Sequence, residues 1–148
     1  MLYRIFEILH KIKPAKKVYA HCDIPCGIYT PEPALTAAKT VAKMVEKIEE
    51  LPQDMLPTLD TRNSFVRMVH VKEEHAQICK KELLILWTDY FKPEHLGDFP
   101  ELHDTFWKAA KLCSKNKQGV NLQTAQELLK AVEEIAEIFR QAESSKHR

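Results

Sequence analysis

The chain has 148 residues, of which 45% are hydrophobic and 29% charged, and its formal net charge at pH 7 is +1. This length suits one domain with a buried core, and the balanced charge argues against a dedicated nucleic-acid binder. No apolar run approaches the length that spans a bilayer, so we expect no membrane-embedded segment. The four cysteines are too few and too unevenly placed for a secreted disulfide scaffold, which favours a cytoplasmic setting.

Residues 1–20 differ in charge from the rest of the chain. They contain five basic residues and one acidic residue, a net charge of +4, which leaves −3 for residues 21–148. Charged residues interrupt the apolar positions of this segment, so it lacks the continuous apolar core of a secretory signal. We predict a short amphipathic helix that ends near Pro14. Two interpretations stay open here: an N-terminal helix docked on the domain, or a leader removed after Ala20.

Residues 21–29 read His-Cys-Asp-Ile-Pro-Cys-Gly-Ile-Tyr and bring together two thiols and an imidazole. Pro25 and Gly27 do not suit a helix, so this segment predicts a tight loop. Soft sulfur and imidazole donors in one loop indicate a metal site. The Cys-x-x-x-Cys spacing is a weak signal by itself, because such pairs also occur incidentally, in dithiol redox proteins and in zinc sites.

Cleavage before His21 would change the donors that this loop offers. The new amine of His21, together with the backbone nitrogen and thiolate of Cys22, would close two fused five-membered rings in one plane. Cys26 supplies a fourth in-plane donor, and the His21 imidazole can approach along the axis. Two nitrogens and two thiolates in a square favour nickel(II) or copper(II), whereas zinc prefers a tetrahedron. Because thiolates and a deprotonated amide stabilise trivalent nickel, the loop predicts a one-electron redox centre.

Helical periodicity describes the chain beyond the loop. A first helix is expected to begin with the prolines after Thr30 and to run to Leu51. The second helix has an apolar face that steps by four and three residues from Phe65 to Tyr90, interrupted only at Lys72. Pro93 and Gly97 end it.

Two further helices complete the predicted fold. Residues 98–101, Asp-Phe-Pro-Glu, predict an N-terminal capping box for a third helix that reaches about Lys115. Asn121 is a plausible cap for the last helix, whose apolar stripe runs from Leu122 to Phe139, and a frayed polar tail begins at Ser144. Four antiparallel helices with short connections predict an all-α, antiparallel four-helix bundle, with the metal loop at its N-terminal end.

Two segments of the chain resemble the nickel-containing superoxide dismutases in their cyanobacterial form. One is the hook at residues 21–29. The other is Trp-Thr-Asp-Tyr-Phe-Lys-Pro at residues 87–93, followed by Pro-Glu-Leu-His at residues 100–103. The resemblance covers the chain from His21 to the last helix. It implies a four-helix bundle assembled as a homohexamer, with one nickel per chain that cycles between Ni²⁺ and Ni³⁺.

The resemblance also implies a reaction and a maturation step. The substrate is the superoxide anion, which is disproportionated to dioxygen and hydrogen peroxide. A dedicated peptidase removes the leader, so residues 1–20 are expected to be cleaved from a dismutase domain that comprises residues 21–148. With the leader attached, the chain is expected to be an inactive precursor with an empty or disordered hook.

Residue roles follow from the same resemblance. The expected metal ligands are His21, Cys22 and Cys26. The candidate catalytic residues lie at the entrance: two tyrosines beside the open axial face that limit access and order water, and a lysine that adds positive potential. These residues are Tyr29, Tyr90 and Lys92. Asp23 is expected to anchor the hook, and Pro25 to follow a cis bond.

The chain departs from the family pattern at the group that orients the axial imidazole. Some members use a Glu and an Arg, whereas this chain has Ala37 and His75 at those positions; His75 is either a substitute or an exposed helix histidine. Cys79 and Cys113 fall on apolar helix faces and are expected to be core residues. The alternative function is a non-catalytic nickel- or zinc-binding module, or a dithiol redox module, that works uncut.

Overall fold

The computed structural model describes residues 27–52 and 58–145. The predicted helix before Pro14, the leader and the hook residues 21–26 lie outside these residues. The described part of the chain is helical and contains no β-strand, as the sequence predicted. Its elements are α2 (Glu32–Glu49), α3 (Leu59–Ile85), the π-helical turn η1 (Leu86–Tyr90), the 3₁₀ turn η2 (Pro93–Gly97), α4 (Leu102–Gln118) and α5 (Leu122–Ser145).

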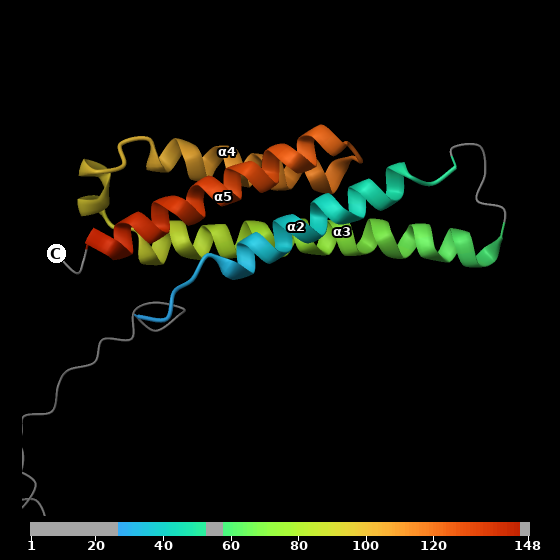
Figure 1. The fold of residues 1–148 in the computed structure, drawn as a ribbon, viewed down its shortest axis with the longest axis horizontal. Helices are drawn as coiled ribbons and strands as arrows, with labels where there is room; N and C mark the ends of the chain where they lie inside the picture. Colours follow the sequence, from blue (N-terminus) through green and yellow to red (C-terminus); the bar gives the residue numbers. More distant parts are fainter. Residues whose placement is uncertain (1–26, 53–57, 146–148) are drawn as a thin grey trace, which may run out of the picture.

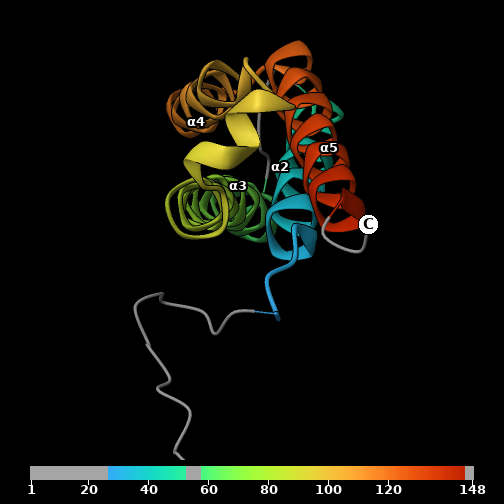
Figure 2. The same cartoon turned by 90° about the vertical axis from the view of Figure 1, so that its left-hand side faces the viewer.

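The four long helices form an antiparallel bundle, which confirms the predicted fold. Helix α3 packs against α2 and α4, and α5 packs against the same two helices, so the four close into a ring (Figure 2). Each helix runs opposite to the one before it along the chain (Figure 1). One end of the bundle therefore gathers the start of α2, the turns η1 and η2, and the end of α5. No described helix combines the length and the apolar character needed to cross a membrane.

Side-chain caps begin two of the helices. At the start of α3, the Thr58 hydroxyl accepts from the backbone N–H of Thr61, and the Thr61 hydroxyl accepts from the N–H of Thr58, each at 3.1 Å. The predicted cap of the last helix is confirmed, because Asn121 Oδ1 accepts from the Thr124 N–H at 2.8 Å. Such caps satisfy N–H groups that have no partner inside the helix.

The predicted capping box at residues 98–101 is wrong. Helix α4 begins at Leu102, with Glu101 at the N-cap position and no side-chain capping bond there. Asp98 instead follows η2, and the Phe99 N–H donates to the carbonyl of His95 at 2.9 Å. Because η2 occupies the chain up to Gly97, the helix begins later than its local sequence suggested. It also continues to Gln118, almost one turn past the predicted end.

Lys72 does not interrupt the buried face of α3 but forms part of it. The residue is 1% exposed, and its Nζ donates to the carbonyl of Gly119 at 2.8 Å and to that of Asn116. These carbonyls lie at the end of α4, where helical carbonyl groups have no partner within the helix and the helix dipole favours a cation. Burial lowers the pKa of Lys72. The lysine is therefore a buried cap that ties α3 to α4.

The core lies between the four helices. Cys79 on α3 and Cys113 on α4 are both fully buried within it, as expected for core residues. Contact with the Cys113 thiol and burial raise the pKa of Cys79. A buried thiol with a raised pKa is a poor nucleophile and a poor metal ligand. The two cysteines therefore act as apolar packing residues.

Candidate metal centre

The described chain begins with a turn that fits the predicted loop. Gly27 has a φ of 94°, a left-handed conformation that glycine adopts without steric cost. Two residues later, the ring of Tyr29 lies with its centroid 5.7 Å from that of Tyr90. The segment that follows the predicted hook is thus held against the end of α3. The two candidate catalytic tyrosines, 61 positions apart in the printed sequence, meet at one end of the bundle.

A change in helical winding positions Tyr90. The residues after Ile85 form a π-helical turn, in which the Phe91 N–H donates to the carbonyl of Leu86 at 3.1 Å. A π turn has more residues per turn than an α-helix, so Leu86 and Tyr90 fall on the same buried side. Such turns occur frequently at functional sites. The α-helical spacing predicted the burial of Tyr90 but not the turn that achieves it.

Aromatic rings surround Tyr90 on several sides. Its ring centroid lies 4.4 Å from that of Phe139 on α5, 4.8 Å from that of Phe91, and 5.8 Å from that of His95 on η2. The Tyr90 hydroxyl donates to Glu143 Oε1 at 2.5 Å. Burial, and then the hydrogen bond to Glu143 and its negative charge, raise the pKa of Tyr90 well above its usual range. Tyr90 is therefore a neutral phenol at physiological pH.

The two halves of the second sequence motif contact each other. Trp87 Nε1 donates to His103 Nδ1 at 2.8 Å, and the Trp87 ring stacks on Phe106 with centroids 5.8 Å apart. Phe91 also contacts Phe106, at 5.5 Å. The start of α4 thus braces both ends of η1, which fixes the turn that carries Tyr90.

Lys92 lies at the surface next to this cluster. Its side chain is exposed, and its backbone N–H donates to His95 Nδ1 at 2.9 Å. That bond fixes the His95 ring beside Tyr90. The Lys92 side chain is anchored two residues from Tyr90, so its charge is close enough to raise the local potential for an anion.

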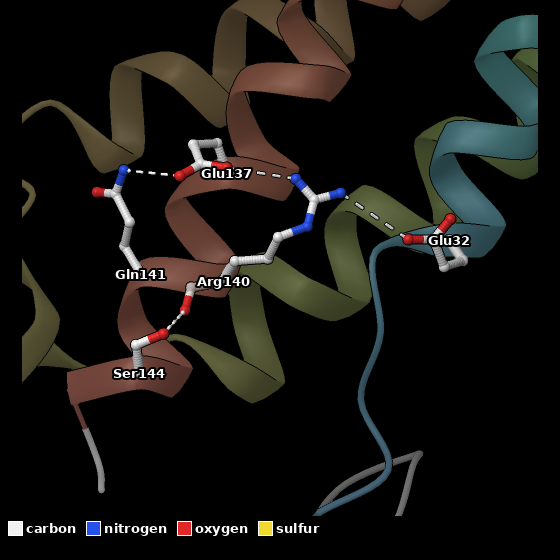
Figure 3. A network of polar contacts seen from close by, with 5 residues as sticks. All are labelled: Glu32, Glu137, Arg140, Gln141 and Ser144. Carbon is white, nitrogen blue, oxygen red and sulfur yellow. Dashed lines mark hydrogen bonds and ion pairs between the residues drawn. The ribbon is translucent and has the colours of Figure 1, made fainter.

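An ion-pair network joins the beginning of α2 to the end of α5 beside the site. Arg140 Nη1 lies 3.4 Å from Glu137 Oε2, and Arg140 Nη2 lies 4.0 Å from Glu32 Oε1 (Figure 3). Glu137 also accepts from Gln141, and the Ser144 hydroxyl donates to the Arg140 carbonyl. All these side chains are exposed, so each pair contributes little to stability. Their effect is to hold Glu32, the first residue after the loop to enter a helix, against α5.

The predicted ligands His21, Cys22 and Cys26 lie outside the described residues. Within the described residues, no group of three His, Cys, Asp or Glu side chains could hold a metal. The hook therefore remains the candidate donor set. Its two thiolates with nitrogen donors have the chemistry that nickel accepts. The chain leads from this hook through Gly27 directly to the tyrosine pair.

The structure gives His75 no place in the tyrosine cluster. Its Nδ1 pairs with the carbonyl of Val71 in the same helix at 2.9 Å. At 1.5 Å per residue, it lies roughly 20 Å from Tyr90 along the helix. Ala37, the other position discussed above, is buried in the core. The sequence also missed three residues that contact Tyr90: His95, Phe139 and Glu143.

An all-α bundle with a cysteine-containing N-terminal segment and a tyrosine pair where that segment joins defines a helical protein with a candidate metal hook. The family model described as nickel-containing superoxide dismutase matches residues 16–143. A superoxide dismutase [Ni] of Streptomyces seoulensis is 36% identical over 139 residues, covering 94% of this chain and 95% of the relative. One from Streptomyces coelicolor is 34% identical over the same shares of the two chains.

Solved structures agree with this match. A crystal structure of Ni-containing superoxide dismutase, in the state after partial X-ray-induced reduction, has a TM-score of 0.72 and 34% identity, covering 84% of this chain and 99% of its own. A native nickel superoxide dismutase structure has a TM-score of 0.71 and 32% identity, covering 83% and 99%. The chain belongs to the nickel-containing superoxide dismutase family.

Proposed function

We propose that this chain disproportionates superoxide, 2 O₂•⁻ + 2 H⁺ → O₂ + H₂O₂, at one nickel ion held by the hook. The family match supports this activity over the alternative of an uncut binding or redox module. The observation that carries the proposal is the contact between Tyr29 and Tyr90 where the chain leaves the hook. This contact lies where a substrate approaching the hook would meet the bundle.

The residues of the chain divide the work. His21, Cys22 and Cys26 hold the metal, and nickel bound by such donors supplies one-electron exchange between its divalent and trivalent states. Tyr29 and Tyr90 narrow the approach, so that only a small anion and ordered water reach the hook. Lys92 attracts the anion in a domain whose net charge is otherwise −3, by the charge balance given above.

We also propose that residues 1–20 are a leader and that a dedicated peptidase removes it. The His21 amine is a ligand in this scheme, and it exists only after cleavage. The solved structures cover 99% of their own chains but 83–84% of this one, whereas the two relatives cover 94% of it. Removal of a leader from the solved chains would produce such a difference.

A homohexamer in the cytoplasm completes the proposal. Large apolar side chains remain exposed on the bundle, among them Leu59 at 81%, Val66 at 63% and Trp107 at 53%. The first turns of α3, which carry Leu59 and Val66, extend past the ends of α4 and α5 (Figure 1). Exposed apolar surface of this kind is compatible with contacts between subunits. The interrupted apolar pattern of residues 1–20 and the free buried cysteines favour the cytoplasm.

Protein purified from its own host tests the proposal by N-terminal sequencing and metal analysis. We expect a chain that begins at His21 and holds about one nickel, because one hook supplies one set of donors. Cys22→Ser and Cys26→Ser should each remove nickel and dismutase activity. Equal nickel binding by the uncut chain would exclude the amine as a ligand, and activity in either serine variant would exclude the thiolates.

A further inference from the structure

Helix α5 holds the Tyr90 side chain through two residues one helical turn apart. Phe139 packs on the Tyr90 ring, and Glu143 Oε1 accepts its hydroxyl proton at 2.5 Å. Residues separated by four positions lie on the same face of a helix, so one face of α5 makes both contacts. Phe139 fixes where the ring lies, and Glu143 fixes where its hydroxyl points.

The bond to Glu143 is of a strong type. A phenol that donates to a carboxylate makes a short, charge-assisted hydrogen bond. Tyr90 is 6% exposed and Glu143 is half-buried, so little water competes for this bond. The hydroxyl rotor of Tyr90 is therefore held in one direction.

We propose that Glu143 is a positioning residue for the dismutase reaction: it fixes the direction of the Tyr90 hydroxyl beside the hook. This inference rests on the proposed role of Tyr90 at the substrate entrance. It goes beyond that role because it states what the hydroxyl can do. A phenol has one proton to donate, and Glu143 accepts it, so the Tyr90 oxygen offers only lone pairs to other partners. Tyr90 thus orders water by accepting from it, and it does not give its proton directly to the substrate.

Three titratable side chains face Tyr90 from different elements. Tyr29 approaches from the segment after the hook, His95 stacks on the ring from η2, and Glu143 binds the hydroxyl from α5. Of these three, only Glu143 is bonded to the Tyr90 hydroxyl by a carboxylate. Its negative charge disfavours the tyrosinate, so its removal should make Tyr90 easier to ionise.

The first test measures Tyr90 directly and needs no metal. The chain has four tyrosines, so changing Tyr3, Tyr19 and Tyr29 to Phe leaves Tyr90 as the only one. In this background, tyrosinate absorbance is followed against pH, with helical circular dichroism recorded at each point. Glu143→Gln should lower the pH at which Tyr90 ionises. Glu133→Gln, an exposed glutamate on the same helix, is the matched control and should leave it unchanged.

The second test uses the processed, nickel-loaded enzyme. Glu143→Ala should lower kcat/KM by about tenfold to a hundredfold, the loss expected when a functional group is misplaced. Glu143→Gln keeps an acceptor oxygen and should recover most of that loss. In a Tyr90→Phe background, Glu143→Ala should cause no further loss, because the two residues act as one unit.

Two results would overturn the inference. One is equal ionisation of Tyr90 with and without the Glu143 carboxylate while the helices remain folded. The other is an equal loss of kcat/KM from Glu143→Ala in the presence and absence of the Tyr90 hydroxyl. Failure of the proposed function looks different: Tyr90→Phe would retain full activity, or Cys22→Ser would retain nickel and activity.

Discussion

Replacement of Lys72 by methionine is expected to destabilise the bundle. Methionine keeps a long unbranched side chain in the core but has no donor for the carbonyls at the end of α4. In the native chain, Lys72 Nζ donates to Asn116, to Gly119 at 2.8 Å and to Lys117 at 3.4 Å. Without Nζ, these acceptors must find water or remain without a partner.

The expected loss follows from the burial of each acceptor. Asn116 is 2% exposed, so its carbonyl cannot be hydrated, whereas Gly119 is exposed and water can replace the lysine there. An unsatisfied buried acceptor costs about 1–3 kcal/mol. Methionine also removes the cost of burying an ammonium group, and the lowered pKa of Lys72 shows that this cost is real. We expect the capping loss to dominate, with a decrease of about 1–3 kcal/mol in the free energy of unfolding.

Urea denaturation of the metal-free chain, followed by helical circular dichroism at fixed protein concentration, measures this change. Lys80→Met is the matched control. Lys80 is half-buried on the same helix and donates to the Ser114 hydroxyl at 3.1 Å, so its loss should cost no more than about 1 kcal/mol. A Lys72→Met chain as stable as the native one, or more stable, would refute the reasoning. It would mean that desolvation of the ammonium outweighs the capping bonds.

Three further predictions address the site and the core. Rising ionic strength should lower kcat/KM, and Lys92→Gln should lower both kcat/KM and its salt dependence; a salt-independent native rate would exclude steering. The pKa of Tyr90 is raised above its unfolded value of 10.0, so the stability it contributes is complete below about pH 10 and is lost above it. Urea denaturation across this range should show a smaller loss in Tyr90→Phe. Cys79→Ala should lower stability by about 1 kcal/mol while nickel content stays unchanged; lost nickel would make Cys79 more than a core residue.

The sequence predicted the helices well where a helix buries one face along its whole length. The stripe of α5 and the four-and-three spacing of α3 gave both helices and their buried sides. Prediction failed between Leu86 and Glu101, where the chain changes from π to 3₁₀ winding. Contacts from other helices set these turns, such as the bond from Trp87 to His103, and local spacing contains no record of them.

The candidate site was predictable in part. Resemblance identified Tyr29 and Tyr90, and the structure brings them together. Glu143 was not predicted, because a glutamate near the end of an exposed helix looks like an ordinary surface residue. Its position four residues after Phe139 was the available signal, since that spacing places it at the edge of the buried stripe. Lys72 was misjudged for a similar reason: a lysine on an apolar face reads as an interruption until the carbonyls that it caps are known.

The bundle and the hook are separable in energetic terms. Every residue of the described core lies between Ala34 and Ala142, so the core is built without any of the predicted metal ligands. In small zinc domains, by contrast, metal binding supplies the folding energy. Here the helices should fold before cleavage and before nickel binds, with the tyrosine pair already in position. Loss of activity in a Cys22 or Cys26 variant would then report on the chemistry of the hook, because the frame that presents the hook remains folded.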